Sequence, residues 1–75
     1  MRTELFRILH ESFDVPSDEI RSEKTLDELG IDSVAALELS EILHERLGVS
    51  VSEDEVSTQN TVEQLATIVT KKAGA

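Results

Sequence analysis

Residues 29–47 read LGIDSVAALELSEILHERL and are followed by Gly48. Asp32 and Ser33 can each cap the start of a helix, because both side chains accept hydrogen bonds from free backbone N–H groups. Gly48 is a normal residue for the left-handed position that follows a helix. Between them, four apolar residues recur at the spacing of one helix face: Ala36, Leu39, Leu43 and Leu47. The stretch predicts a helix from Asp32–Ser33 to about Leu47.

Weaker patterns on either side predict the rest of the fold. Residues 3–14 carry an apolar stripe at helical spacing, and Val15-Pro16 ends it because a residue before proline avoids the α conformation. Residues 15–32 form a long loop, with a short helical turn expected at residues 17–20. Its apolar residues are spaced as anchors to a core: Val15, Ile20, Leu26, Leu29 and Ile31.

Two capping-box patterns follow the central helix. Ser52-x-x-Glu55 predicts a short third helix, and Thr61-x-x-Gln64 predicts a last helix. The fold class expected is all-α: a small helical bundle of three main helices plus one short helix, with a long loop between the first and second helices. Residues 1–75 are expected to form a single domain.

The composition excludes several function classes. A chain of 75 residues has no room for a deep, two-layered cleft, which argues against most enzymes. It has no Cys, so disulfides, thiolate zinc sites and a Cys nucleophile are excluded. The acidic clusters lack the spacing of a calcium loop, so no metal site is expected. No apolar run has the length of a signal peptide or membrane span, and a cytoplasmic location is expected.

Negative charge is concentrated in the middle of the chain. The sequence has 16 acidic and 7 basic residues, and residues 27–56 contain Arg46 as their only Lys or Arg. This disfavours nucleic acid and anionic membranes as partners. One interpretation is a solvated surface that maintains solubility. The other is a docking surface that steers basic partners.

The central helix has a second face that the core does not explain. Val34 and Leu37 share it with Glu38, Glu41 and Glu45. The long loop could fold over the two apolar residues. Alternatively, they are small apolar contacts of a partner interface, surrounded by negative charge.

Residues 29–39, LGIDSVAALEL, resemble the signature of acyl carrier proteins and related phosphopantetheine-binding carrier domains. That signature is a Leu-Gly-x-Asp-Ser run followed by an apolar residue and an acidic amphipathic helix. The order and lengths of the expected elements also resemble this family over essentially the whole chain. The resemblance implies that a separate phosphopantetheinyl transferase esterifies Ser33 with 4'-phosphopantetheine from coenzyme A. The thiol of that group would hold acyl chains as thioesters.

The resemblance also assigns roles to the neighbours of Ser33. Asp32 would help to engage the transferase, in addition to capping the helix. The partner enzymes would be acyl-loading, ketosynthase or acyltransferase types with basic docking surfaces. The residues implied to meet them are Val34, Leu37, Glu38, Glu41 and Glu45. Val34 departs from the family, in which Leu is commonest at this position.

The expectation is therefore a freestanding, monomeric acyl carrier, with no catalysis of its own, in polyketide, fatty-acid or related secondary metabolism. The sequence of residues 32–39 is closer to polyketide carriers. Hydrolysis by Ser33 itself is not expected, because His44 would lie about 16 Å away along one helix and His10 is on another. Two alternatives remain open: an aminoacyl or peptidyl carrier, and a non-covalent acidic helical adaptor without a prosthetic group.

Overall fold

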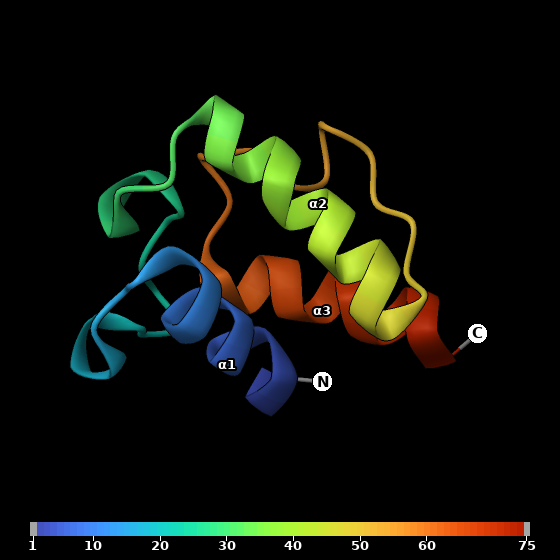
Figure 1. The fold of residues 1–75 in the computed structure, drawn as a ribbon, viewed down its shortest axis with the longest axis horizontal. Coiled ribbons are helices and arrows are strands. Elements are labelled where there is room, and N and C mark those ends of the chain that lie inside the picture. Colours follow the sequence, from blue (N-terminus) through green and yellow to red (C-terminus); the bar gives the residue numbers. More distant parts are fainter. Residues whose placement is uncertain (1, 75) are drawn as a thin grey trace.

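Three α-helices form the framework of the computed structural model, which describes residues 2–74 (Figure 1). Two 3-10 helices lie in the long connection between the first two α-helices. The elements in chain order are α1 (Arg2–Phe13), η1 (Ser17–Glu19), η2 (Asp27–Leu29), α2 (Ser33–Leu47) and α3 (Val62–Gly74). Residues 2–74 contain no strand, only one antiparallel bridge between Thr25 and Thr61. The all-α class, the three main helices and the long loop are confirmed.

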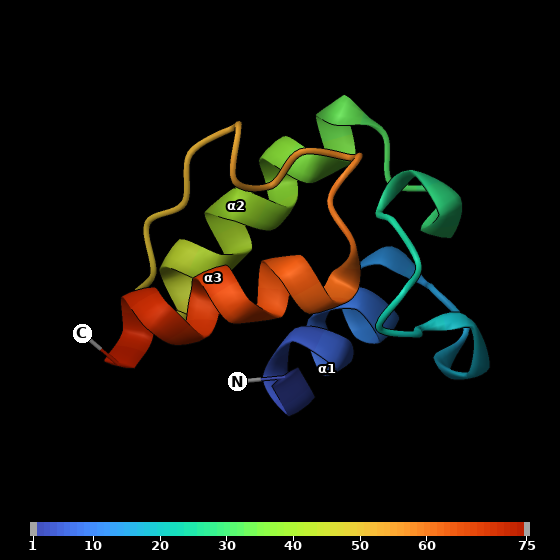
Figure 2. The same ribbon diagram turned by 180° about the vertical axis from the view of Figure 1, so that it is seen from behind.

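The helices and their connections share one core. α1 packs against α3 and runs in the opposite direction to α2 and α3 (Figures 1 and 2). The largest fully buried side chains come from all three α-helices and from both connections: Leu5, Ile8, Leu9, Leu26, Ile31, Leu39, Leu43, Val49, Val56, Val62, Leu65 and Val69. The apolar stripes and most of the loop anchors predicted from the sequence are therefore the residues that pack.

Both ends of α2 follow the predicted signals. Asp32 is the cap: its Oδ1 accepts the Ala35 N–H at 2.9 Å. At the other end Gly48 adopts a left-handed conformation with φ of 65°, and its N–H donates to His44 O at 3.0 Å. Gly30 is also left-handed, with φ of 84°, and turns the chain from η2 toward α2. A side chain at either position would be strained.

The long loop is also tied to the connection that precedes α3. Residues 22–27 lie beside residues 58–63 and exchange backbone hydrogen bonds with them, a feature called here the loop pairing. The bonds run from Leu26 N to Asn60 O, Asp27 N to Thr58 O, Val62 N to Lys24 O and Glu63 N to Ser22 O, at 2.9–3.1 Å. The loop pairing fixes the segment that leads into α2.

The short helix expected after Ser52 does not form, and residues 53–56 are hydrogen-bonded turns instead. The capping box is only half made, since Ser52 N–H donates to the Glu55 carboxylate at 2.8 Å. In a helix, the Glu55 carbonyl would accept the Gln59 N–H. Here that carbonyl accepts Asn60 Nδ2 at 2.9 Å, while Gln59 N–H donates to Ser57 Oγ at 3.2 Å. These competing bonds end the helical turn.

Candidate functional site

Ser33 is the first residue of α2, and its side chain is exposed. Asp32, the residue before it, already provides the cap, so the Ser33 hydroxyl is not used to start the helix. The first turn of any helix has N–H groups without partners inside the helix and lies at the positive end of its dipole. An anionic group bonded to Ser33 Oγ would meet this environment.

A cavity of about 430 Å³ opens beside Ser33 and is called here the Ser33 cavity. Ser33, Ala36 and Leu37 of α2 line one side of it. The other side, called here the cavity wall, is formed by residues 53–58 without Glu55. Figures 1 and 2 show that after α2 the chain runs back alongside the helix before α3 begins. The volume is in the range of small-ligand pockets.

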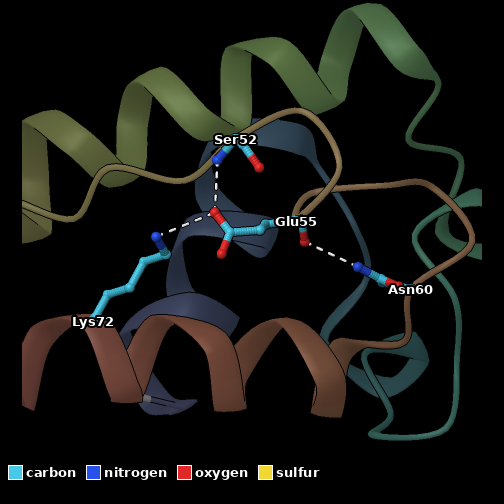
Figure 3. A network of polar contacts seen from close by, with 4 residues as sticks. All are labelled: Ser52, Glu55, Asn60 and Lys72. Atoms are coloured by element: carbon cyan, nitrogen blue, oxygen red, sulfur yellow. Dashed lines mark hydrogen bonds and ion pairs between the residues drawn. The ribbon is translucent and has the colours of Figure 1, made fainter.

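Glu55 connects the cavity wall to α3 (Figure 3). Its Oε1 accepts the Ser52 N–H and lies 3.2 Å from Lys72 Nζ. The hydrogen bond from the Ser52 N–H is the main reason that the pKa of Glu55 is lowered, and Lys72 lowers it further. The carboxylate is thus held in its charged form between two elements.

The second face of α2 is open. Val34 is 67% exposed and Leu37 is 48% exposed, and they are the exposed large apolar residues of the described chain. The alternative in which the long loop covers them is therefore wrong. Glu38, Glu41 and Glu45 are exposed beside them. In residues 2–74 their carboxylates form no hydrogen bond or ion pair.

The C-terminal half of this face borders a second, more open cavity of about 760 Å³. Glu38, Glu41 and Glu45 line it together with Ile42, His44 and Val51 among others. The structure therefore brings the three predicted acidic residues to one shallow surface, which they share with the apolar side chains of Ile42 and Val51.

The histidines have no arrangement typical of a catalytic base for Ser33. His10 Nδ1 lies 2.8 Å from the carbonyl oxygen of Val15, just beyond the end of α1, and His44 is exposed near the end of α2. No group of three acidic, His or Cys side chains within the described chain is placed to hold a metal ion. None of the helices described is long and apolar enough to cross a membrane.

Comparison with known proteins gives two findings. The family model described as "Phosphopantetheine attachment site" matches residues 3–69. The non-reducing polyketide synthase Preu3 of Preussia isomera is 34% identical over 67 residues, which are 89% of this chain and 3% of the synthase. The chain thus spans about 3% of the length of this relative.

These matches confirm the resemblance and identify the prosthetic group as 4'-phosphopantetheine, held covalently. The residues present fit such a group. The structure has an exposed serine hydroxyl at a helix N-terminus. The cavity beside it has room for part of an elongated prosthetic group. These matches support the role of a carrier for a covalently bound group. The chain belongs to the family of phosphopantetheine-binding carrier domains.

Proposed function

We propose that Ser33 is the attachment residue and that the chain is an acyl carrier of polyketide-type biosynthesis. The observation that carries the assignment is the position of Ser33. It is the exposed first residue of α2, next to the capping Asp32 and at the mouth of the Ser33 cavity. Ser57 and Thr58 are the other hydroxyl residues that line this cavity, but neither is at a helix N-terminus.

Each residue at the start of α2 has a distinct task in this proposal. Ser33 Oγ is the oxygen to which a separate transferase joins the phosphate. Asp32 fixes the first turn through the Ala35 N–H and presents a carboxylate beside Ser33, where the transferase approaches. When bound, the group supplies a terminal thiol that carries acyl chains. Because the sequence has no Cys, no other thiol of the chain competes with it.

The partner enzymes are proposed to dock on the exposed face of α2. Val34 and Leu37 supply apolar contact, and Glu38, Glu41 and Glu45 supply negative charge around it. The transferase, acyl-loading enzymes and ketosynthase- or acyltransferase-type enzymes with basic surfaces fit this face. Complementary charge would speed encounter, and the apolar contacts would prolong the complex.

The polyketide assignment rests on the relative, a non-reducing polyketide synthase. That relative also favours an acyl cargo over an aminoacyl cargo. The expectation that this carrier acts as a separate, monomeric polypeptide stays a prediction. The mass of the native polypeptide tests whether the carrier is a separate protein. Its sedimentation tests whether it is a monomer.

Intact mass spectrometry tests the attachment residue. The chain is incubated with coenzyme A, magnesium and a transferase of broad specificity. We expect the mass to rise by one phosphopantetheinyl group in the wild type and in the control Ser57→Ala, and to stay unchanged in Ser33→Ala. Circular dichroism should show that both variants keep their helices. Modification of Ser33→Ala would refute the assignment, and an unmodified wild type would favour the non-covalent adaptor. Loading assays with acyl and aminoacyl donors then distinguish the two cargo classes.

A further inference from the structure

Within residues 53–58, Glu55 is the exception to the pattern of the cavity wall. The other residues of this segment line the Ser33 cavity, whereas the Glu55 carboxylate lies toward α3 (Figure 3). There its Oε1 is shared between the Ser52 N–H, at 2.8 Å, and Lys72 Nζ, at 3.2 Å. Lys72 belongs to the last turn of α3, far from Ser33 along the chain.

Residue 55 is held by its backbone as well. Asn60 Nδ2 donates to the Glu55 carbonyl at 2.9 Å (Figure 3). The next residue, Val56, is 2% exposed and contributes both to the core and to the cavity wall. The position of residue 55 therefore helps to set that of Val56, its neighbour in the chain, which lines the side of the Ser33 cavity that faces α2.

Other restraints on this segment are backbone hydrogen bonds at its two ends, from the Glu55 and Val56 N–H groups to Ser52 O and from the Asp27 N–H to Thr58 O. The segment has neither helix nor strand, and its only fully buried side chain is that of Val56. Segments with few buried contacts open locally at low free energy. A partly exposed ion pair can then determine how often the wall opens, even though it adds little to the stability of the whole domain.

We propose that the ion pair between Lys72 and Glu55 positions the wall of the Ser33 cavity, so that a lysine of α3 controls the opening beside the attachment residue. Lys72 acts through Glu55 and is a positioning residue. The use of the cavity by the attached group rests on the proposed function, whereas the coupling of Lys72 to the wall does not.

Amide hydrogen exchange of the unmodified 75-residue chain tests the proposal. The Glu55 and Val56 N–H groups both donate to Ser52 O and report on the wall. We expect Lys72→Met to accelerate their exchange roughly 1.5- to 5-fold, the range for loss of a partly exposed ion pair. Amides of the buried part of α2, such as Leu43, should keep their rates. The amide chemical shifts of Ala36 and Leu37, across the cavity, should also move.

Lys71→Met is the matched control, because it removes the same charge from the neighbouring position, and it should change none of these values. Lys72→Arg keeps the positive charge and should therefore show the wild-type exchange rates at Glu55 and Val56. Unchanged exchange at Glu55 and Val56 in Lys72→Met would overturn the proposal. So would equal acceleration at Leu43, which indicates global destabilisation, or equal acceleration in Lys71→Met, which indicates an effect of net charge. Since no prosthetic group is involved, the result is independent of the mass test of Ser33.

Discussion

The two faces of α2 are both partly apolar but have different surroundings. Leu39 and Leu43 are fully buried, whereas Leu37 is 48% exposed and Val34 is 67% exposed on the same helix. Packing in the core explains why Leu39 and Leu43 are apolar. It does not explain why Leu37 and Val34 are apolar. Val34 and Leu37 lie outside the core stripe, next to carboxylates that have no partner within residues 2–74, and this combination is the reason to propose the exposed face as a docking surface.

Replacing one leucine on each face gives the largest contrast. Leu39→Ala should lower the free energy of unfolding by about 2–5 kcal/mol, because it leaves a cavity in the core. Leu37→Ala should change it by less than about 0.5 kcal/mol and should instead slow the reaction with the transferase. Urea denaturation and the rate of phosphopantetheine transfer measure the two effects. Similar losses of stability in both variants would show that Leu37 packs as a core residue.

Charge reversal on the exposed face gives the next effect. Glu41→Lys should lower the association rate with a basic partner by on the order of tenfold at low salt, because steering depends on complementary charge. The loss should shrink at higher ionic strength, where screening acts over about 8 Å. Stopped-flow kinetics at several salt concentrations measures this. Glu11→Lys in α1 makes the same change in net charge away from the face, and an equal loss there would mean that only overall charge matters.

Asp32 caps α2 directly before Ser33, and two variants separate its capping role from its proposed role in binding the transferase. Asp32→Ala should lower stability by about 1 kcal/mol because the Ala35 N–H loses its acceptor. Asp32→Asn keeps an acceptor oxygen and should retain most of that stability. If the charge engages the transferase, both variants should be modified more slowly than the wild type. A normal modification rate in Asp32→Asn would leave capping as the role of Asp32.

The smallest effect concerns a carboxylate that has partners, in contrast to Glu38, Glu41 and Glu45, which have none within residues 2–74. The pKa of Glu55 is lowered from its ordinary value of 4.5, first by the Ser52 N–H and further by Lys72. The contribution of the charged form to stability is therefore complete above pH 4.5 and is lost as the pH falls through the lower pKa of the folded state. Glu55→Gln keeps an oxygen for Ser52 but loses the charge.

The stability of Glu55→Gln should therefore be lower than that of the wild type near pH 7 and should converge with it in acid. Urea midpoints between pH 7 and pH 3 measure the difference. Glu45→Gln, on the exposed face, should show no loss of stability at pH 7. A constant difference for Glu55→Gln down to the lowest pH would show that its charge is not responsible.

The sequence was sufficient to predict the elements whose signals are local. The helical spacing, a cap at Asp32 or Ser33 and the end at Gly48 predicted α2 closely, because these interactions join residues that are near each other in the chain. Ser33 was singled out by the same stretch. Thr25-x-x-Glu28 is a further capping box, at η2: Thr25 N–H donates to Glu28 Oε1 at 2.9 Å, and the Glu28 N–H donates back to Thr25 Oγ at 3.1 Å. Its Thr-x-x-Glu pattern is a local signal of the same kind, legible in the sequence.

The remaining features depend on contacts between distant segments. The pattern at Ser52 predicted a helix. In the structure the side chain of Asn60 donates to the Glu55 carbonyl, which would accept a backbone hydrogen bond in a helix. Neither the Ser33 cavity nor the contact of Lys72 with Glu55 has a local signal. The cavity requires α2 and the connection after it to be placed first, and the contact requires that connection and α3. The exposure of Val34 also depends on the path of the long loop, which does not cover this side chain.

The loop pairing has a consequence for how the chain tolerates change in length. Residues 22–27 are fixed against residues 58–63, so an insertion there would shift the start of α2 and the position of Ser33. Residues 16–19 are exposed, and within η1 no side chain is buried. Doubling the length of a flexible loop adds only about 0.6 kcal/mol of closure entropy. The long connection is thus divided into a stretch that can accept an inserted peptide or a tag and a stretch that cannot.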